Sequence, residues 1–264
     1  HVQNFTDIDD KIILRALDEQ TTYRDISDLY IQEFTEDMDR LNVKRAHVYT
    51  LATESIPKMV EIISNLLSNG YAYETNGNVY FRVTRNPDYG KLSRRSLDTM
   101  ISGARVEVAE EKEHPMDFTL WKAAKLHEPA WESPWGNGRP GWHIECSAMA
   151  LRLLDGAPID IHAGGVDLIF PHHENEIAQS EGSTGETFSR FWFHVEHLLL
   201  DKGIKMSKSI GNVLSVKEIL SQGYRASALR YVLLSTHYRK QLRFTWDSLA
   251  QAEESLRRLM DCLG

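Results

Sequence analysis

The chain of 264 residues is long enough to bury one large hydrophobic core or two smaller ones, and 42% of its residues are apolar and 26% charged. No apolar run approaches the roughly 18–20 residues that a membrane-spanning helix needs, and no secretory signal peptide is visible. The net charge of −8 does not favour nucleic-acid binding, although a local basic patch would be enough for such binding.

The two cysteines, Cys146 and Cys262, argue against a disulfide scaffold and predict a reducing environment. The composition is that of an ordinary globular protein, with no low-complexity tract and no internal repeat. We therefore expect a soluble, cytoplasmic protein with no membrane partner.

The first 70 residues predict a strand followed by three helices. Residues 2–5 have the pattern of a short strand, and a helix is predicted over about 11–17 with Thr6 or Asp7 as its cap. Apolar side chains at helical spacing predict two further amphipathic helices: Ile26, Leu29, Tyr30, Phe34 and Leu41 mark the first, and Met59, Ile62, Ile63, Leu66 and Leu67 the second. Asn69-Gly70 is expected to end the last of these helices.

The pattern changes after residue 70. Two runs of β-forming residues, 71–75 and 79–83, flank Asn76-Gly77, which is a strong signal for a β-hairpin. From 86 to 140 the chain is polar and rich in turn residues. We interpret about 52–141 as an insertion into the parent domain, because a regular α/β pattern returns only after it.

The second half of the chain predicts alternating helices and strands. A helix is expected from Trp142 to about Leu154, then a strand at 159–162, a Gly-rich turn at 163–165 and a new helix after Pro171. Strands followed by glycines and then helices are typical of a doubly wound parallel sheet. The remainder predicts a mainly helical unit, with helices starting near Val216, Ser227 and Asp247.

Three side chains of the types that bind zinc occur at workable spacing. His172 and Glu176 are four residues apart, so on a helix they project from one face, and Cys146 belongs to the preceding helix. The spacing alone favours an ordinary explanation, namely a buried cysteine, a histidine at a helix N-terminus and a surface glutamate. The nearby Gly164-Gly165 and Asp167 favour a ligand site, since a nucleotide can approach glycine backbone and set its ribose against a carboxylate.

The segment Lys205-Met206-Ser207-Lys208-Ser209 carries two ammonium groups and two hydroxyls, which suit the binding of a triphosphate. Two lysines three apart would indicate only a solvated basic loop, but the whole pentapeptide followed by Ile210-Gly211-Asn212 is much more specific. Lys205 and Lys208 can neutralise charge that develops on an α-phosphate. Together with a thiolate-selective metal, this segment predicts an enzyme that activates a small sulfur-containing substrate with ATP.

Six segments carry a resemblance that runs nearly from end to end of the chain: residues 4–11, 103–106, 115–122, 138–149, 170–176 and 205–209. Together they resemble the cysteinyl-tRNA synthetase family of class I aminoacyl-tRNA synthetases. The resemblance implies an α/β, Rossmann-type doubly wound parallel sheet in two parts, at 1–51 and 142–192, with an inserted connective-peptide subdomain at 52–141. It also implies a mainly helical stem-contact region at 193–246 with the lysine loop, and the start of a helical bundle at 247–264.

The resemblance further implies ATP-dependent activation of L-cysteine to cysteinyl-adenylate and its transfer to the 3′ end of tRNA(Cys), by a monomer that uses Zn²⁺ and, with ATP, Mg²⁺. Cys146, His172 and Glu176 match three of the family's four zinc ligands. That zinc binds the substrate thiolate and rejects serine, because a hydroxyl is a far poorer ligand. Further matches are Thr6 and Trp142 to the amino-acid pocket, Gly164, Gly165 and Asp167 to the adenosine-side turn, and Lys208, with Lys205, to the ATP-contacting signature.

Two departures from the family pattern matter. The family's first zinc cysteine and its HIGH signature precede the strand at 2–5, and no His-x-Gly-His occurs in this sequence. The anticodon-binding region expected beyond the final helix is absent as well. We therefore expect a central portion of the enzyme, with feeble or no adenylation and weakened zinc binding if the polypeptide begins at His1.

Two other functions stay open at this stage. One is the mycothiol-pathway ligase, which joins cysteine to an amino sugar with the same zinc and lysine loop. The other is a synthetase-like zinc-binding module that has lost catalysis. Residues 115–149 and 198–212 look closer to the synthetase than to the ligase.

Overall fold

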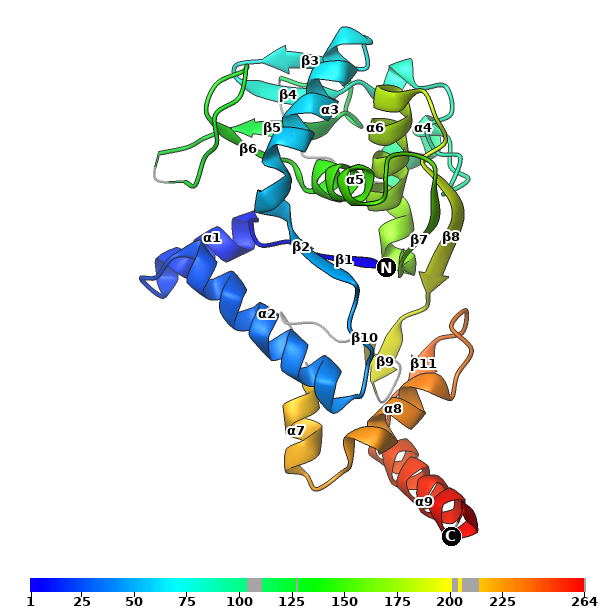
Figure 1. Ribbon diagram of the computed structural model, residues 1–264. Coiled ribbons are helices and arrows are strands. Elements are labelled where there is room, and N and C mark those ends of the chain that lie inside the picture. Colours follow the sequence, from blue (N-terminus) through cyan, green and yellow to red (C-terminus); the bar gives the residue numbers. More distant parts are fainter. Residues whose placement is uncertain (104–110, 127, 201–203, 206–213, 264) are drawn as a thin grey trace. The chain divides into compact units, whose positions relative to one another are not determined.

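The computed structural model describes residues 1–103, 111–126, 128–200, 204–205 and 214–263 (Figure 1). The chain divides into two compact units. The first comprises 1–28, 46–163 and 167–193, and the second comprises 29–45, 164–166 and 194–264. Cys146, His172 and Glu176 all belong to the first unit.

The first unit opens with two parallel strands, β1 (Val2–Phe5) and β2 (Val48–Leu51). Between them in sequence lie the helices α1 (Asp10–Asp18) and α2 (Tyr23–Arg40). The predicted cap of α1 at Thr6 or Asp7 was wrong, because the residue directly before the first turn is Asp9, and its Oδ1 accepts the amide of Ile12 at 2.6 Å. Asp7 is buried instead and accepts the amide and hydroxyl of Thr53.

The segment interpreted as an insertion folds into helices and one antiparallel sheet with strand order β3-β4-β5-β6. Its elements are η1 (Ala52–Ser55), α3 (Ile56–Ser68), β3 (Ala72–Thr75), β4 (Asn78–Phe81), η2 (Val83–Arg85), α4 (Leu97–Gly103), β5 (Phe118–Ala123) and β6 (Gly138–Pro140). The predicted hairpin is confirmed, with positive φ at both Asn76 and Gly77. The strands β5 and β6 were missed, because polar residues and turns surround them and their pairing partners are distant in sequence.

A helix, a strand, a helix and a strand follow: α5 (Trp142–Leu153), β7 (Ile159–Gly165), α6 (Glu174–Thr184) and β8 (Ser189–Val195). Two irregular turns, η3 (Val166–Leu168) and η4 (Ile169–His173), separate β7 from α6. The predicted turn at 163–165 was wrong, since these residues continue β7 and the chain turns only at Val166. Of the predicted parallel sheet, the structure has the parallel pair β1–β2, and β7 pairs with β8 in a separate two-stranded sheet.

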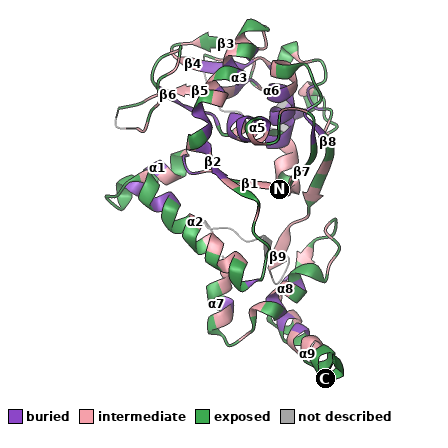
Figure 2. Ribbon diagram, viewed as in Figure 1, coloured by how far each residue is buried: buried purple, intermediate pink, exposed green. Residues whose placement is uncertain are grey.

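The main core of the first unit lies where α3, α5 and α6 meet the antiparallel sheet, and purple marks its buried residues in Figure 2. Its largest fully buried side chains include Met59, Ile62, Phe81, Leu120, Trp121, Ile144 and Met149.

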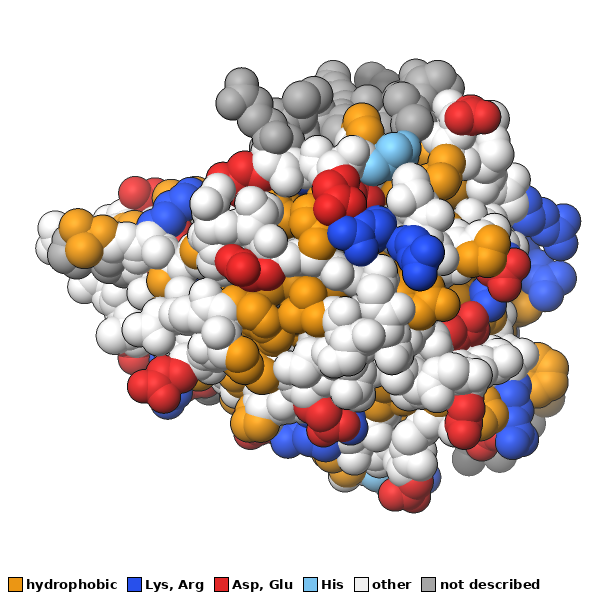
Figure 3. All heavy atoms as spheres, turned by 90° about the horizontal axis from the view of Figure 1, so that it is seen from above, with side chains coloured by type: hydrophobic (Ala, Val, Ile, Leu, Met, Phe, Trp, Pro, Cys, Tyr) orange, Lys and Arg blue, Asp and Glu red, His pale blue; other side chains and the backbone are white. Residues whose placement is uncertain are grey.

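On the face shown in Figure 3, acidic and basic side chains are interspersed with apolar ones, so the described residues there do not form one extended basic surface.

The second unit contains a small sheet of strand order β10-β9-β11, from β9 (Leu198–Leu200), β10 (Ile204–Lys205) and β11 (Leu242–Arg243). The predicted helices are confirmed as α7 (Val216–Ser221), α8 (Ala226–Leu234) and α9 (Trp246–Leu263). Their buried residues, among them Ile219, Leu229, Val232 and Leu249, form a separate core. Within the described part of the chain, no helix combines the length and apolar character needed to cross a membrane.

Candidate metal and substrate site

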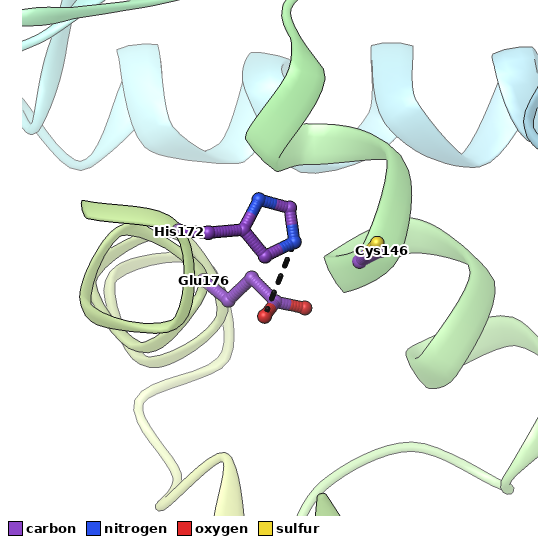
Figure 4. A group of neighbouring side chains, drawn as sticks. All are labelled: Cys146, His172 and Glu176. Carbon is purple, nitrogen blue, oxygen red and sulfur yellow. Dashed lines mark ion pairs between the residues drawn. The ribbon is translucent and has the colours of Figure 1, made fainter. Parts of the chain in front are cut away.

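Cys146, His172 and Glu176 lie together in the first unit. One donor atom from each is within 4.8 Å of the others. Figure 4 shows His172 and Glu176 projecting from the same segment toward α5, which carries Cys146. His172 occupies the wide turn η4 rather than α6 itself, and its Nε2 is 3.6 Å from Oε2 of Glu176. The structure thus brings together the three side chains that the sequence suggested as metal ligands.

Glu176 is the centre of this cluster and is fully buried. Its Oε2 lies 3.0 Å from Nε2 of His162, 3.6 Å from that of His172 and 3.8 Å from that of His173. Burial acts to raise the pKa of Glu176, but the three histidines outweigh burial and hold this pKa below its ordinary value. The carboxylate is therefore the form that the surroundings stabilise.

The other carboxylate oxygen provides a test of whether a cation fits. Oε1 of Glu176 is buried and has no hydrogen-bond partner among the described residues. A buried anionic oxygen without a donor is costly, and a cation would remove that cost. Because a thiol and an imidazole lie beside it, the donor set has the composition that zinc accepts.

Without a metal, the Cys146 thiol and the His172 imidazole differ in their readiness to act as ligands. Burial raises the pKa of the Cys146 thiol well above its ordinary value, and Glu176 and Glu145 raise it further, so the sulfur is protonated at neutral pH. Asn4 donates its side-chain amide to this sulfur at 3.4 Å. Burial lowers the pKa of His172, so the imidazole is neutral and able to ligate a metal, whereas Cys146 would release a proton on metal binding.

A cavity of about 830 Å³ adjoins the cluster. It is lined by residues of β1, α5 and β7 and of the turns before α6, and the predicted pocket residues Thr6 and Trp142 line it together with Cys146 and His172. The Trp142 ring lies 4.3 Å from the His172 ring, centroid to centroid. A small ligand in this cavity could therefore contact Cys146 and His172 as well as the Trp142 ring.

The predicted ATP-contacting residues, unlike the candidate metal ligands, come from several separate elements. Gly164 and Gly165 end β7, and Asp167 lies in η3. Their chain neighbours Ala163 and Leu168 line the cavity. Lys205 lies in β10 of the second unit, and Lys208 lies outside the described residues.

Three further histidines belong to the cluster. His162 and His173 contact Glu176, and Nδ1 of His143 lies 3.0 Å from Nδ1 of His172. Burial lowers the pKa of His143 to about 3, so this ring is neutral. Nothing in the sequence distinguishes His143 and His162 from histidines packed elsewhere in the core.

Comparisons with known proteins show the family of this chain. Residues 1–254 match the family model described as the catalytic domain of tRNA synthetases class I (C). The chain is 53% identical over 262 residues to a Cysteine--tRNA ligase of Caldicellulosiruptor saccharolyticus, covering 99% of this chain and 56% of that protein. It is 54% identical over 259 residues to the enzyme of the same name from Carboxydothermus hydrogenoformans, covering 98% and 55%. The chain thus spans about half the length of the curated relatives it matches.

A solved structure supports the fold. Mycobacterium tuberculosis methionyl-tRNA synthetase, in complex with methionyl-adenylate, matches with a TM-score of 0.69 at 14% identity, covering 95% of this chain and 59% of that one. At this identity the likeness concerns the fold alone. It confirms the predicted Rossmann-type α/β fold, while the boundaries of the connective peptide stay a prediction.

Proposed function

Because the chain belongs to the family of class I (C) tRNA synthetase catalytic domains, we propose that it is the part of a cysteine–tRNA ligase that selects and activates cysteine. The amino-sugar ligase and the inactive zinc module are not favoured, since the curated relatives at 53–54% identity are cysteine–tRNA ligases. The proposed partners are L-cysteine, ATP and tRNA(Cys). We propose that the enzyme is a monomer and that it works in the cytoplasm.

The proposed reaction has two steps. A carboxylate oxygen of cysteine attacks the α-phosphorus of ATP, pyrophosphate leaves, and cysteinyl-adenylate forms. A hydroxyl at the 3′ end of tRNA(Cys) then attacks the acyl carbon, and AMP leaves. Lys205 and Lys208 would stabilise the charge that develops on the α-phosphate, with Mg²⁺ on the remaining phosphates, and Gly164, Gly165 and Asp167 would receive the adenosine.

The observation that carries the proposal is the buried, unpartnered oxygen of Glu176 beside a thiol and a neutral imidazole. Cys146, His172 and Glu176 would hold Zn²⁺. When bound, zinc would take the substrate thiolate as a further ligand and so prefer cysteine to serine. Thr6 and Trp142 would shape the pocket around the rest of the amino acid, and the hydrogen bond from His162 would hold the Glu176 carboxylate in place.

The same proposal assigns the regions of the chain. Residues 1–51 and 142–192 would form the two parts of the catalytic domain, with the connective peptide at 52–141. The stem-contact region would occupy 193–246, and 247–264 would begin a helical bundle.

The test uses the full-length protein and two matched variants. Cys146→Ser replaces the proposed zinc ligand, whereas Cys262→Ser changes an exposed cysteine on α9. We expect Cys146→Ser to lower zinc content and to reduce cysteine-dependent ATP–pyrophosphate exchange by at least roughly a hundredfold, since a metal ligand matters more than an outer-shell partner. Cys262→Ser should keep both values. Unchanged zinc content and exchange in Cys146→Ser would refute the proposal.

A further inference from the structure

We propose that the loop Tyr89–Arg95 of the insertion clamps the start of α6 and thereby positions the metal ligands, with Glu174 as the central positioning residue. The inference rests on the proposed function in that the metal is taken to be Zn²⁺. Glu174 and Asn175 lie between the candidate ligands His172 and Glu176 in the sequence, and both are buried. Neither side chain has a described contact with a candidate metal ligand; both form hydrogen bonds with the loop instead.

Glu174 binds the backbone of this loop with both carboxylate oxygens. Oε2 accepts the amide of Ser93 at 2.7 Å, and Oε1 accepts the amide of Leu92 at 3.3 Å. Hydrogen bonds to a carboxylate are about twice as strong as those between neutral groups. With only 1% of Glu174 exposed, water cannot replace these two donors.

Two more contacts join the loop to the same helix. The hydroxyl of Tyr89 donates to Oδ1 of Asn175 at 2.5 Å, and Lys91 forms an ion pair with Glu181, about two turns further along α6. The loop is thus attached to the helix at its first turn and again beyond it.

The rotation of α6 about its axis follows from these contacts. Successive residues of an α-helix are about 100° apart around the axis, so Glu174, Asn175 and Glu176 point in three different directions. Once Glu174 and Asn175 are bound to the loop, the helix cannot turn, and the direction of the Glu176 carboxylate is fixed. His172, in the turn directly before α6, is constrained with it.

The loop is held in one shape that suits this role. The amide of Arg95 donates to the carbonyl oxygen of Gly90 at 3.2 Å, and Gly90 has φ +102, where a Cβ would lie 2.0 Å from the Arg95 oxygen. The ring of Tyr89 stacks on Phe118 of β5, with centroids 6.4 Å apart. Phe118 in turn contacts His143 edge-on at 5.7 Å.

The other ligand-bearing helix is tied to the same sheet. α5 begins one residue after β6, and a Cβ at the intervening Gly141 would lie 2.0 Å from the carbonyl oxygen of Thr119 in β5. The sheet therefore fixes the start of the helix that carries Cys146, and the loop fixes the start of the helix that carries Glu176. The insertion sets the spacing between the two sets of ligands.

The test measures metal binding in the full-length protein rather than its activity. Zn²⁺ affinity is determined by competition with a chromophoric chelator, and the visible absorption of the Co²⁺-substituted protein reports the ligand geometry. We expect Glu174→Ala to lower Zn²⁺ affinity, by no more than the roughly 10–100-fold that loss of a direct hydrogen-bond partner of a metal ligand costs, and to change the Co²⁺ spectrum. Glu174→Gln, which keeps one oxygen acceptor, should lose less.

Glu113→Ala is the matched control, because Glu113 belongs to the same insertion but pairs at the surface with Arg82. Its zinc affinity should be that of the unsubstituted protein. If Glu174→Ala does not fold, Tyr89→Phe still tests the clamp: it removes one hydroxyl, keeps the ring, and should lower Zn²⁺ affinity roughly two- to tenfold, the equivalent of one hydrogen bond.

Folded Glu174→Ala or Tyr89→Phe with unchanged Zn²⁺ affinity and Co²⁺ spectrum would overturn the inference while leaving the proposed function intact. Failure of the unsubstituted full-length protein to bind Zn²⁺ would instead contradict the proposed function, and this inference with it.

Discussion

Nε2 of His162 lies 3.0 Å from Oε2 of Glu176, although the two residues come from β7 and α6. This hydrogen bond engages one carboxylate oxygen and leaves Oε1 without a donor among the described residues. The histidine thus orients the carboxylate, and the oxygen that remains is the one available to a cation.

Replacing His162 should weaken metal binding without removing a ligand. We expect His162→Phe to lower Zn²⁺ affinity roughly 10–100-fold, because the Glu176 carboxylate loses its orienting donor. His162→Gln, which keeps an N–H donor, should lose less. Chelator competition measures both, and His237→Phe, at an exposed histidine of the second unit, serves as the control. Equal affinities of His162→Phe and the control would contradict the orienting role.

Glu145 should make folding stability depend on pH. Burial raises its pKa well above the ordinary 4.5, and the charges of Asp7 and Asp9 raise it further. The folded protein therefore retains a proton that the unfolded chain releases, so the stability lost at this residue grows as pH rises from about 4.5 to the folded-state pKa. Glu145→Gln is neutral at every pH and should raise the Tm more at pH 8 than at pH 5.

The measurement is thermal unfolding at the two pH values, with Glu61→Gln, at an exposed position of α3, as the control. The control substitution should shift the Tm by the same small amount at pH 5 and at pH 8. An equal shift of the Tm by Glu145→Gln at pH 5 and pH 8 would show that the folded-state pKa is not raised.

Asp117 should contribute strongly to the stability of the first unit. Its buried carboxylate accepts the Tyr73 hydroxyl at 2.8 Å and the amides of Val83 and His114 at 2.9 and 3.0 Å. We expect Asp117→Ala to lower the free energy of unfolding by about 3 kcal/mol or more, because three donors lose their acceptor. Urea denaturation checks this value against Asp98→Ala, an exposed residue of α4; a loss below about 1 kcal/mol would contradict it.

The sequence indicated those features that depend on short stretches of chain. The hairpin at Asn76-Gly77 needs only the turn residues and the two flanking runs, so it was predictable. The strand β6 was not, because it pairs with β5 across 14 intervening residues and its own three residues carry no strand pattern. The sheet β3-β4-β5-β6 is therefore largely a product of tertiary packing.

The candidate site, like the fold, could be predicted from the sequence only in part. The spacing of His172 and Glu176 suggested that both could reach one ion, and Cys146 on the preceding helix completed the candidate set. The family resemblance then matched all three to zinc ligands. The contacts of His162 and His143 were not predictable, because they form only when β7 and α5 pack against α6. The contacts of Glu174 with Leu92 and Ser93 likewise join positions more than 80 residues apart.

Zinc K-edge X-ray absorption of the full-length protein, alone and with cysteine or serine, tests the central claim most directly. We predict one additional sulfur ligand at about 2.3 Å from the zinc when cysteine is bound, and no such ligand with serine. A spectrum that cysteine and serine leave equally unchanged, in protein that binds both zinc and cysteine, would contradict selection of the substrate through its sulfur.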